Sequence, residues 1–206
     1  MKHIAIEGNI GAGKTTLTRM LLNSLPARAM LEPFDENPLL PLFYADPSKH
    51  ALSLEISFMA QRFLQWSRWT TQTDLFYPFL VSDYHCDKSK LFAALNLDED
   101  TFAVFDRLYQ GMRKHLVPPE VLIYVHRPLE VLEKNIALRA RPYEQGMPMD
   151  YLRRIEQAYS DWLPQCGAQA VLRWELNEKK MEDLAEQYAR ILDFVRAPWN
   201  SFVILS

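Results

Sequence analysis

The sequence predicts an α/β fold in which a parallel β-sheet is covered by helices on both faces. Short apolar runs alternate with longer segments of helical periodicity along the chain of 206 residues. Such alternation is typical of parallel sheets with helical crossovers. A glycine-rich turn also follows the first apolar run directly. At this length the chain fits a single domain, residues 1–206.

The predicted elements follow from the periodicity of apolar residues and from the positions of proline. Buried strands are expected at Lys2–Glu7, Ala27–Leu31, Phe79–Asp83, Val121–Val125 and Ala170–Trp174. Helices are expected at Lys14–Leu25 (ending near Pro26), Ala51–Trp69, Glu99–His115, Leu129–Leu138, Met149–Leu163 and Met181–Val195. The second helix carries one apolar stripe formed by Leu52, Ile56, Met59, Phe63 and Trp66.

Composition narrows the class of partner. The net charge is −3 and Lys and Arg form no run, so a nucleic-acid backbone is a poor partner and a small substrate is favoured. No apolar run approaches the roughly 18 residues of a membrane span, and no signal peptide is visible. The two cysteines, Cys86 and Cys166, lack metal-ligand spacing. A cytoplasmic protein that contacts neither nucleic acid nor membrane is therefore expected.

The turn from Gly8 to Thr15 satisfies the phosphate-binding pattern G-x-x-x-x-G-K-[ST] in full. Its glycines let backbone N–H groups surround phosphate oxygens at the start of a helix. Lys14 would reach the outer phosphates of ATP, and the Thr15 hydroxyl would ligate Mg²⁺. A chance match is disfavoured because three of the six glycines in the chain lie here. The nucleotide-binding residues expected are Gly8, Asn9, Ile10, Gly11, Ala12, Gly13, Lys14, Thr15 and Thr16.

Glu32 follows the predicted strand Ala27–Leu31. The carboxyl edge of a parallel sheet is where α/β folds bind ligands. There the carboxylate could accept the proton of a hydroxyl that attacks the γ-phosphate. A solvated loop glutamate is the alternative.

Glu55 and Arg62 lie seven residues apart on the long predicted helix. At about 100° per residue they fall within roughly 20° of each other, two turns apart, beside Phe58. A carboxylate and a guanidinium flanking an aromatic ring could hydrogen-bond the edge of a planar base. A pair of charges at the rim of the core is the alternative.

Arg139 and Arg141 open a polar turn that runs to Gly146. Two guanidinium groups on a mobile lid, about residues 139–148, could stabilise charge on a transferred phosphoryl group. A solvated helix end is the alternative. The chain lacks both N-K-x-D and D-x-x-G, so a switch GTPase is disfavoured and a small-molecule kinase is favoured.

Four segments in this order resemble the deoxynucleoside kinase family, and bacterial deoxyadenosine and deoxyguanosine kinases in particular. They are IEGNIGAGKTT, LEPFDENPLLPLFYADP, LEISFMAQRF and LRARPYEQGMPMDYL. The resemblance implies a P-loop kinase fold with a five-stranded parallel sheet, a homodimer, and ATP with Mg²⁺. It also implies phosphorylation of the 5′-hydroxyl of a purine deoxynucleoside for salvage, with deoxyadenosine as the first expectation.

The resemblance also assigns roles to residues. Glu32 would be the general base, and Lys14, Arg139 and Arg141 would act on the phosphates. The substrate-binding residues implied are Glu32, Tyr44, Glu55, Met59, Arg62, Asp83 and Glu144, of which Tyr44 and Glu144 would hold the sugar 3′-hydroxyl. Thr15 and Asp83 would ligate the metal, and Asn177–Lys179 would pack on the ATP adenine.

Two positions depart from the family pattern. Glu55 stands where the family has a glutamine, and an ionised glutamate only accepts hydrogen bonds, which suits an amino group on the base. After the third strand, Asp83-Tyr84 stands where an acidic residue and an arginine are usual. Asp83 could keep the metal-related role or fall on the arginine position itself. Either way a positive charge is missing, and Lys88 or a lid arginine is left to supply it.

Two other functions are compatible with the phosphate-binding loop. A thymidylate-type nucleoside monophosphate kinase would need cations for the phosphate of its substrate, and Glu32 disfavours that. A non-catalytic nucleotide-binding regulator would explain a lost arginine, but Lys14, Glu32 and the paired lid arginines argue against it.

Overall fold

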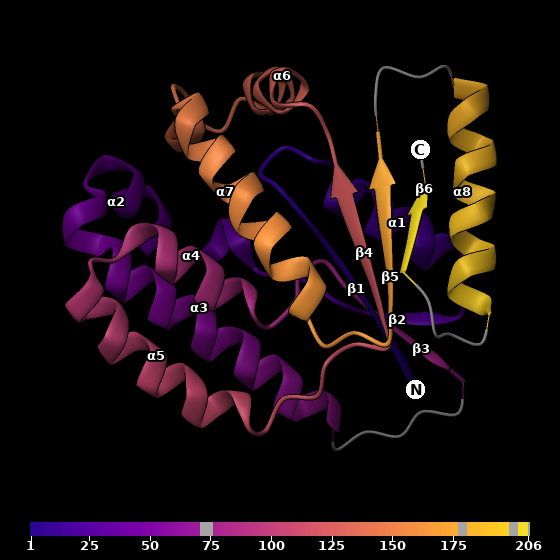
Figure 1. Ribbon diagram of the computed structural model, residues 1–206, viewed down its shortest axis with the longest axis horizontal. Helices are drawn as coiled ribbons and strands as arrows, with labels where there is room; N and C mark the ends of the chain where they lie inside the picture. Colours follow the sequence, from indigo (N-terminus) through magenta and orange to yellow (C-terminus); the bar gives the residue numbers. More distant parts are fainter. Residues whose placement is uncertain (71–75, 177–180, 198–201, 206) are drawn as a thin grey trace.

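The fold is a single parallel sheet between layers of helices (Figure 1). The computed structural model describes residues 1–70, 76–176, 181–197 and 202–205. Within these ranges six strands form the sheet in the order β2-β3-β1-β4-β5-β6, every pair parallel. The strands are β1 (Lys2–Gly8), β2 (Ala27–Met30), β3 (Phe79–Ser82), β4 (Val121–His126), β5 (Ala170–Glu175) and β6 (Phe202–Leu205).

Helices cover both faces of this sheet (Figure 1). They are α1 (Lys14–Ser24), α2 (Leu39–Ala45), α3 (Pro47–Thr70), α4 (Lys88–Asn96), α5 (Glu99–Arg113), α6 (Leu129–Arg139), α7 (Met149–Trp162) and α8 (Met181–Arg196). Three short 3₁₀ turns lie at η1 (Phe34–Glu36), η2 (Pro142–Glu144) and η3 (Leu163–Gln165). One face packs against α1 and α8 and the other against α7, α4 and the last turns of α3, with α5 outside α4. None of the described helices is both long and apolar enough to cross a membrane.

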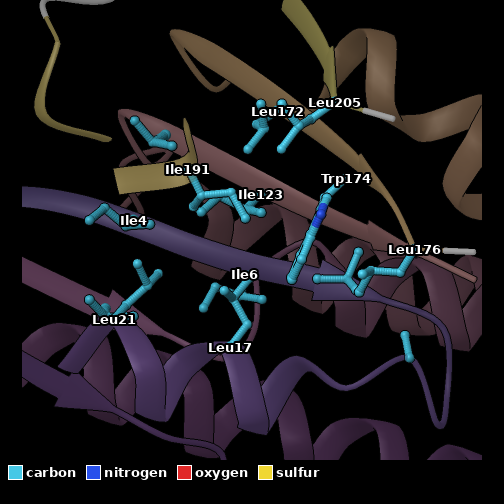
Figure 2. Packing of buried hydrophobic residues seen from close by; sticks show 14 of the residues in the cluster. Ile4, Ile6, Leu17, Leu21, Ile123, Leu172, Trp174, Leu176, Ile191 and Leu205 are labelled. Atoms are coloured by element: carbon cyan, nitrogen blue, oxygen red, sulfur yellow. The ribbon is translucent and has the colours of Figure 1, made fainter. Parts of the chain in front are cut away.

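The core follows the two-residue alternation of the central strands. Ile4 and Ile6 of β1 face α1, whereas Ala5 between them faces α7. Figure 2 shows Leu21 and Leu17 of α1 reaching Ile4 and Ile6, respectively. Both faces of the central strands are therefore buried, which is why these strands are continuous apolar runs rather than alternating ones.

The five predicted strands and six predicted helices are all present, with ends that differ by a few residues. The sheet has six strands rather than five, because β6 pairs in parallel with β5, Leu172 lying opposite Val203. The sequence analysis did not predict α2 or α4. In α2, Pro38 is the N-cap and Pro41 lies in the first turn, where proline is tolerated.

The strand order places a ligand site at the carboxyl end of β1. The connection from β1 leads to β2 on one side, whereas the connection from β4 leads to β5 on the other. Between such diverging connections the carboxyl ends of adjacent strands leave a crevice. The loop after β1, the residues after β2 and β3, and the residues after β4 all meet there.

Candidate active site

A cavity of about 630 Å³ opens at this carboxyl edge. Its size is that of a small-molecule site. Its walls come from the loop between β1 and α1, the segment after β2, the helices α2, α3 and α4, and the lid with the adjoining ends of α6 and α7. Segments that are far apart in the sequence thus converge on one pocket.

Glycine is required at two points of the loop between β1 and α1. A Cβ at Gly8 would lie 2.4 Å from the backbone oxygen of Val125 on β4. Gly13 has φ 99° and starts α1, which has no side-chain cap. The first N–H groups of α1 are therefore available to an anion at the cavity, which Ile10 to Thr16 line.

Lys14 lies across this loop. Its Nζ donates to the backbone oxygens of Gly8 and Asn9, at 2.8 and 3.0 Å. Burial lowers the pKa of Lys14 to about 8, aided by the positive charge of Lys88 and opposed by nearby carboxylates. A phosphate that entered the loop would offer this ammonium a charged acceptor in place of the two carbonyls.

The lowered pKa of Lys14 predicts an alkaline limit on nucleotide capture. Because the free enzyme loses the Lys14 charge as pH rises through about 8, kcat/KM for ATP should fall above that pH. A bound triphosphate favours the charged form, so kcat should hold to higher pH. Steady-state kinetics across pH 6–10 would check this, with kcat/KM for ATP independent of pH above about 8 as the contradicting result.

Glu32 is held by two cations at the centre of the cavity wall. Its Oε1 pairs with Arg62, and its Oε2 accepts from Lys88 Nζ at 2.6 Å; the Glu32 side chain is 6% exposed. Burial alone raises the pKa of Glu32, but the charges of Arg62 and Lys88 outweigh it and bring it to about 2. Glu32 is therefore ionised, with its carboxylate oriented from both sides.

Asp83 and Tyr84, directly after β3, lie in different surroundings. Asp83 lines the cavity, and its Oδ1 accepts from the backbone N–H of Glu32 at 2.8 Å. Tyr84 is buried and points away, its hydroxyl donating to Gln65 at 2.6 Å. The cation that contacts Glu32 from this side is Lys88, on the first turn of α4.

Glu55 and Arg62 lie on the same face of α3, as their spacing predicts, and both line the cavity. Glu55 is 3% exposed and its Oε1 accepts from Asn96 Nδ2 at 3.0 Å. Both terminal nitrogens of Arg62 are engaged, one with Glu32 and the other with Ser89. Arg62 therefore orients Glu32 in this structure, a role that the sequence analysis did not assign to it.

The lid is folded onto Glu144. This carboxylate is fully buried and pairs with Arg139, while Arg141 Nη1 lies 3.4 Å from its Oε1. The Arg141 guanidinium also lies 4.9 Å from the centre of the Phe34 ring. Tyr44 and Glu144 line the same cavity, and the ring next to Glu144 in sequence, Tyr143, stacks on Tyr44 at 5.6 Å.

Three of the expected binding residues lie outside the cavity lining. Met59 packs between α3 and α5 with Phe105, because its direction on α3 falls about 40° from Glu55, on the side away from Phe58 and Arg62. Gly8 is buried in β1, and the Asn9 amide donates to the backbone oxygen of Leu152 on α7 at 2.8 Å. The segment expected at the ATP adenine, Asn177–Lys179, lies outside the described residues.

Sequence reasoning missed several residues that shape the site. Arg127 Nε donates to Ala12 O at 2.9 Å and Asn135 Nδ2 donates to Gly11 O at 2.8 Å, so both brace the phosphate-binding loop. Arg127 follows a buried strand at the carboxyl edge of the sheet, a position that could have identified it. Nothing in the local sequence singles out Asn96, which reaches Glu55 from another helix.

Comparison with known proteins gives one consistent result. The deoxynucleoside kinase family model matches residues 4–200. The chain is 32% identical to a deoxyguanosine kinase of Lactobacillus acidophilus over 79% of this chain and 75% of the relative. It is 31% identical to a deoxyadenosine kinase of Dictyostelium discoideum over 98% of this chain and 74% of the relative. The fold is similar to that of deoxyadenosine kinase from M. mycoides with bound dATP, with a TM-score of 0.79 and 19% identity over 95% of this chain and all of the other.

Proposed function

This chain belongs to the deoxynucleoside kinase family, and we propose that it transfers the γ-phosphate of ATP to the 5′-hydroxyl of a purine deoxynucleoside. The observation that carries the proposal is the position of Glu32. Its carboxylate, ionised and held by two cations, shares one cavity with the phosphate-binding loop and with the Glu55 face of α3. A phosphate donor, an acceptor for the hydroxyl proton and a base-binding wall thus meet in one space.

At the donor end, we propose that the loop N–H groups and Lys14 hold the triphosphate. The Thr15 hydroxyl and the Asp83 carboxylate both line this part of the cavity, and hard oxygen donors of this kind fit Mg²⁺. When bound, Mg²⁺ supplies positive charge to the phosphate oxygens. Asp83 also fixes the backbone of Glu32, so the residue proposed to hold the metal and the proposed base are joined by a hydrogen bond.

At the acceptor end, we propose that Glu32 orients the 5′-hydroxyl and takes its proton. A carboxylate has about four lone-pair sites. Arg62 and Lys88 occupy one on each oxygen, which leaves a site for the hydroxyl. Phosphoryl transfer depends mainly on positioning and charge stabilisation, so a strongly ionised and rigid acceptor suits the step better than a strong base.

Lys88 is proposed as the cation that acts where the phosphoryl group passes to the hydroxyl. Its ammonium contacts Glu32, and its charge is the strongest one acting on the ammonium of Lys14. Lys88 thus contacts the acceptor end, and its charge also acts on Lys14 at the donor end. The lid arginines are held by Glu144 in this structure and would act on the phosphates after the lid rearranges.

Sugar and base recognition are proposed from the remaining walls of the cavity. Tyr44 and Glu144 would hold the 3′-hydroxyl, and Glu55 would read the exocyclic group of the base. Relatives named deoxyguanosine kinase and deoxyadenosine kinase support a purine substrate. An ionised Glu55 accepts hydrogen bonds, which favours the amino group of deoxyadenosine. Cytoplasmic localisation and homodimeric assembly stay predictions from the sequence.

ADP release by the purified protein with ATP and a panel of acceptors tests the proposal. We expect turnover with deoxyadenosine and deoxyguanosine, and none with the corresponding 5′-monophosphates, because Glu32 occupies the acceptor end where a substrate phosphate would need cations. Turnover with monophosphates alone would identify a nucleoside monophosphate kinase. ATP binding without turnover of any acceptor would identify a regulator.

A further inference from the structure

A chain of hydrogen bonds from three helices ends on the carboxyl group of Glu55. The Tyr151 hydroxyl on α7 donates to Asn96 Oδ1 on α4 at 3.0 Å. Asn96 Nδ2 in turn donates to Glu55 Oε1 on α3 at 3.0 Å. Because Tyr151 engages the amide oxygen, the amide nitrogen is the end that faces Glu55.

This chain distinguishes the two oxygens of Glu55. Oε1 receives an N–H and is therefore an acceptor in both protonation states. A proton on Glu55 consequently resides on Oε2. Glu55 lines the cavity beside Phe58 and Arg62, so Oε2 is the oxygen left to meet a ligand.

Charged and titratable groups from every neighbouring element act on Glu55. Burial disfavours the ionised form, and Glu32 after β2 acts in the same direction. Asn96 and Lys88 on α4 and Arg62 on α3 favour the ionised form, and Tyr151 is the titratable group on α7. Burial predominates and raises the pKa of Glu55 to about 7, so both forms are populated near neutral pH.

We propose that Glu55 recognises bases by two chemistries: ionised Oε2 accepts a hydrogen bond from an exocyclic amino group, and protonated Oε2 donates one to an exocyclic oxygen. A glutamine offers both a donor and an acceptor at every pH, whereas Glu55 exchanges one for the other. The preference between 6-amino and 6-oxo purines therefore depends on pH. This inference rests on the proposed function, because it concerns the acceptor nucleoside.

Deoxyadenosine and deoxyinosine form the matched pair of substrates for the test, since one carries an amino group and the other an oxygen at position 6. The measured quantity is the ratio of kcat/KM for deoxyadenosine to that for deoxyinosine, from about pH 6 to pH 8.5 at saturating ATP. Ionisations that affect both substrates alike, such as that of Lys14, cancel in this ratio. We expect the ratio to rise at least about tenfold with a midpoint near 7, since the protonated fraction of Glu55 falls about thirtyfold over this range.

Two variants separate recognition from general effects on the fold. In Glu55→Gln the ratio should not change with pH, because an amide does not ionise in this range. In Asn96→Leu the hydrogen bond that favours ionised Glu55 is lost, so the midpoint should move to higher pH. If Asn96 only supported the fold, Asn96→Leu would lower kcat/KM for both nucleosides without moving this midpoint.

The outcomes are distinguishable. A wild-type ratio that stays constant while both nucleosides are phosphorylated would overturn this inference and leave the proposed function standing. A midpoint that persists unchanged in Glu55→Gln would assign the pH dependence to another group and overturn the inference as well. Absence of turnover with every nucleoside would overturn the inference and the proposed function together. The first of these outcomes needs the wild type alone, so the inference can be overturned whether or not a variant folds.

Discussion

Glu32→Gln is expected to lower kcat by about 10²–10⁴-fold with every deoxynucleoside that the wild type accepts. The amide keeps the size of the side chain but takes no proton, and it gives Arg62 and Lys88 no negative partner. The two buried positive charges then lack the negative charge that neutralises part of them in the wild type. The loss should appear in kcat, because the hydroxyl proton leaves only during transfer.

The matched control is Glu36→Gln, which makes the same change on an exposed side chain four residues further along the chain. It should retain wild-type kcat. ATP affinity of Glu32→Gln, measured by fluorescence titration or calorimetry, should remain close to wild type because the phosphate-binding loop is intact. A Glu32→Gln protein that binds ATP and phosphorylates deoxyadenosine at the wild-type rate would contradict the role of Glu32.

Lys88→Met is expected to lower kcat by about 10²–10³-fold, the effect of removing one charge that stabilises a transition state. It should also change the acid side of the pH profile. Lys88 helps to hold the pKa of Glu32 at about 2, and burial raises that pKa once the ammonium is gone. The carboxylate then becomes protonated at a higher pH than in the wild type, so kcat should begin to fall at a higher pH.

Two controls belong with this variant. Lys88→Arg keeps the charge and should recover part of kcat. Lys90→Met alters a half-exposed lysine on the same helix, whose ammonium pairs with Asp106 at 2.8 Å away from the cavity, and should leave kcat unchanged. If the acid limb of Lys88→Met stays where it is in the wild type, Lys88 does not hold down the pKa of Glu32, and that part of its role is wrong.

Much of the fold could be predicted because its signals are local. The central strands are buried on both faces and are therefore apolar runs that periodicity finds. The sixth strand was missed because it has only four residues, Phe202–Leu205, and lies at the edge of the sheet, where it pairs with β5 alone. The helix α4 was missed for a related reason: it has nine residues, and its main contacts lie on α3 and α7.

Site residues could be predicted where they belong to sequence motifs that occur in a fixed order along the chain. Lys14, Glu32, Glu55, Arg62 and Glu144 all line one cavity. The partners of these residues were not predictable, because ion pairing is decided in three dimensions. Arg62 was expected at the base, yet it binds Glu32. Lys88 remained one of several candidate cations until the structure brought it within 2.6 Å of Glu32.

The location of Met59 could not be predicted from its angular position on the helix. It lies on the apolar stripe of α3 and close to Glu55 in direction, so sequence could not separate the cavity wall from the core. The boundary is set by α5, whose Phe105 packs against Met59. Which part of a helix face meets a ligand depends on the helix that covers the rest.

The central claim is that the 5′-hydroxyl of a deoxynucleoside receives the γ-phosphate of ATP with Glu32 as the acceptor of its proton. The most direct measurement follows the transfer of labelled γ-phosphate to deoxyadenosine and to 2′,5′-dideoxyadenosine, which lacks only that hydroxyl. The account predicts labelled deoxyadenosine 5′-monophosphate from the first compound with the wild type, far less with Glu32→Gln, and no product from the second. Labelled product from 2′,5′-dideoxyadenosine, or only inorganic phosphate from deoxyadenosine, would contradict it.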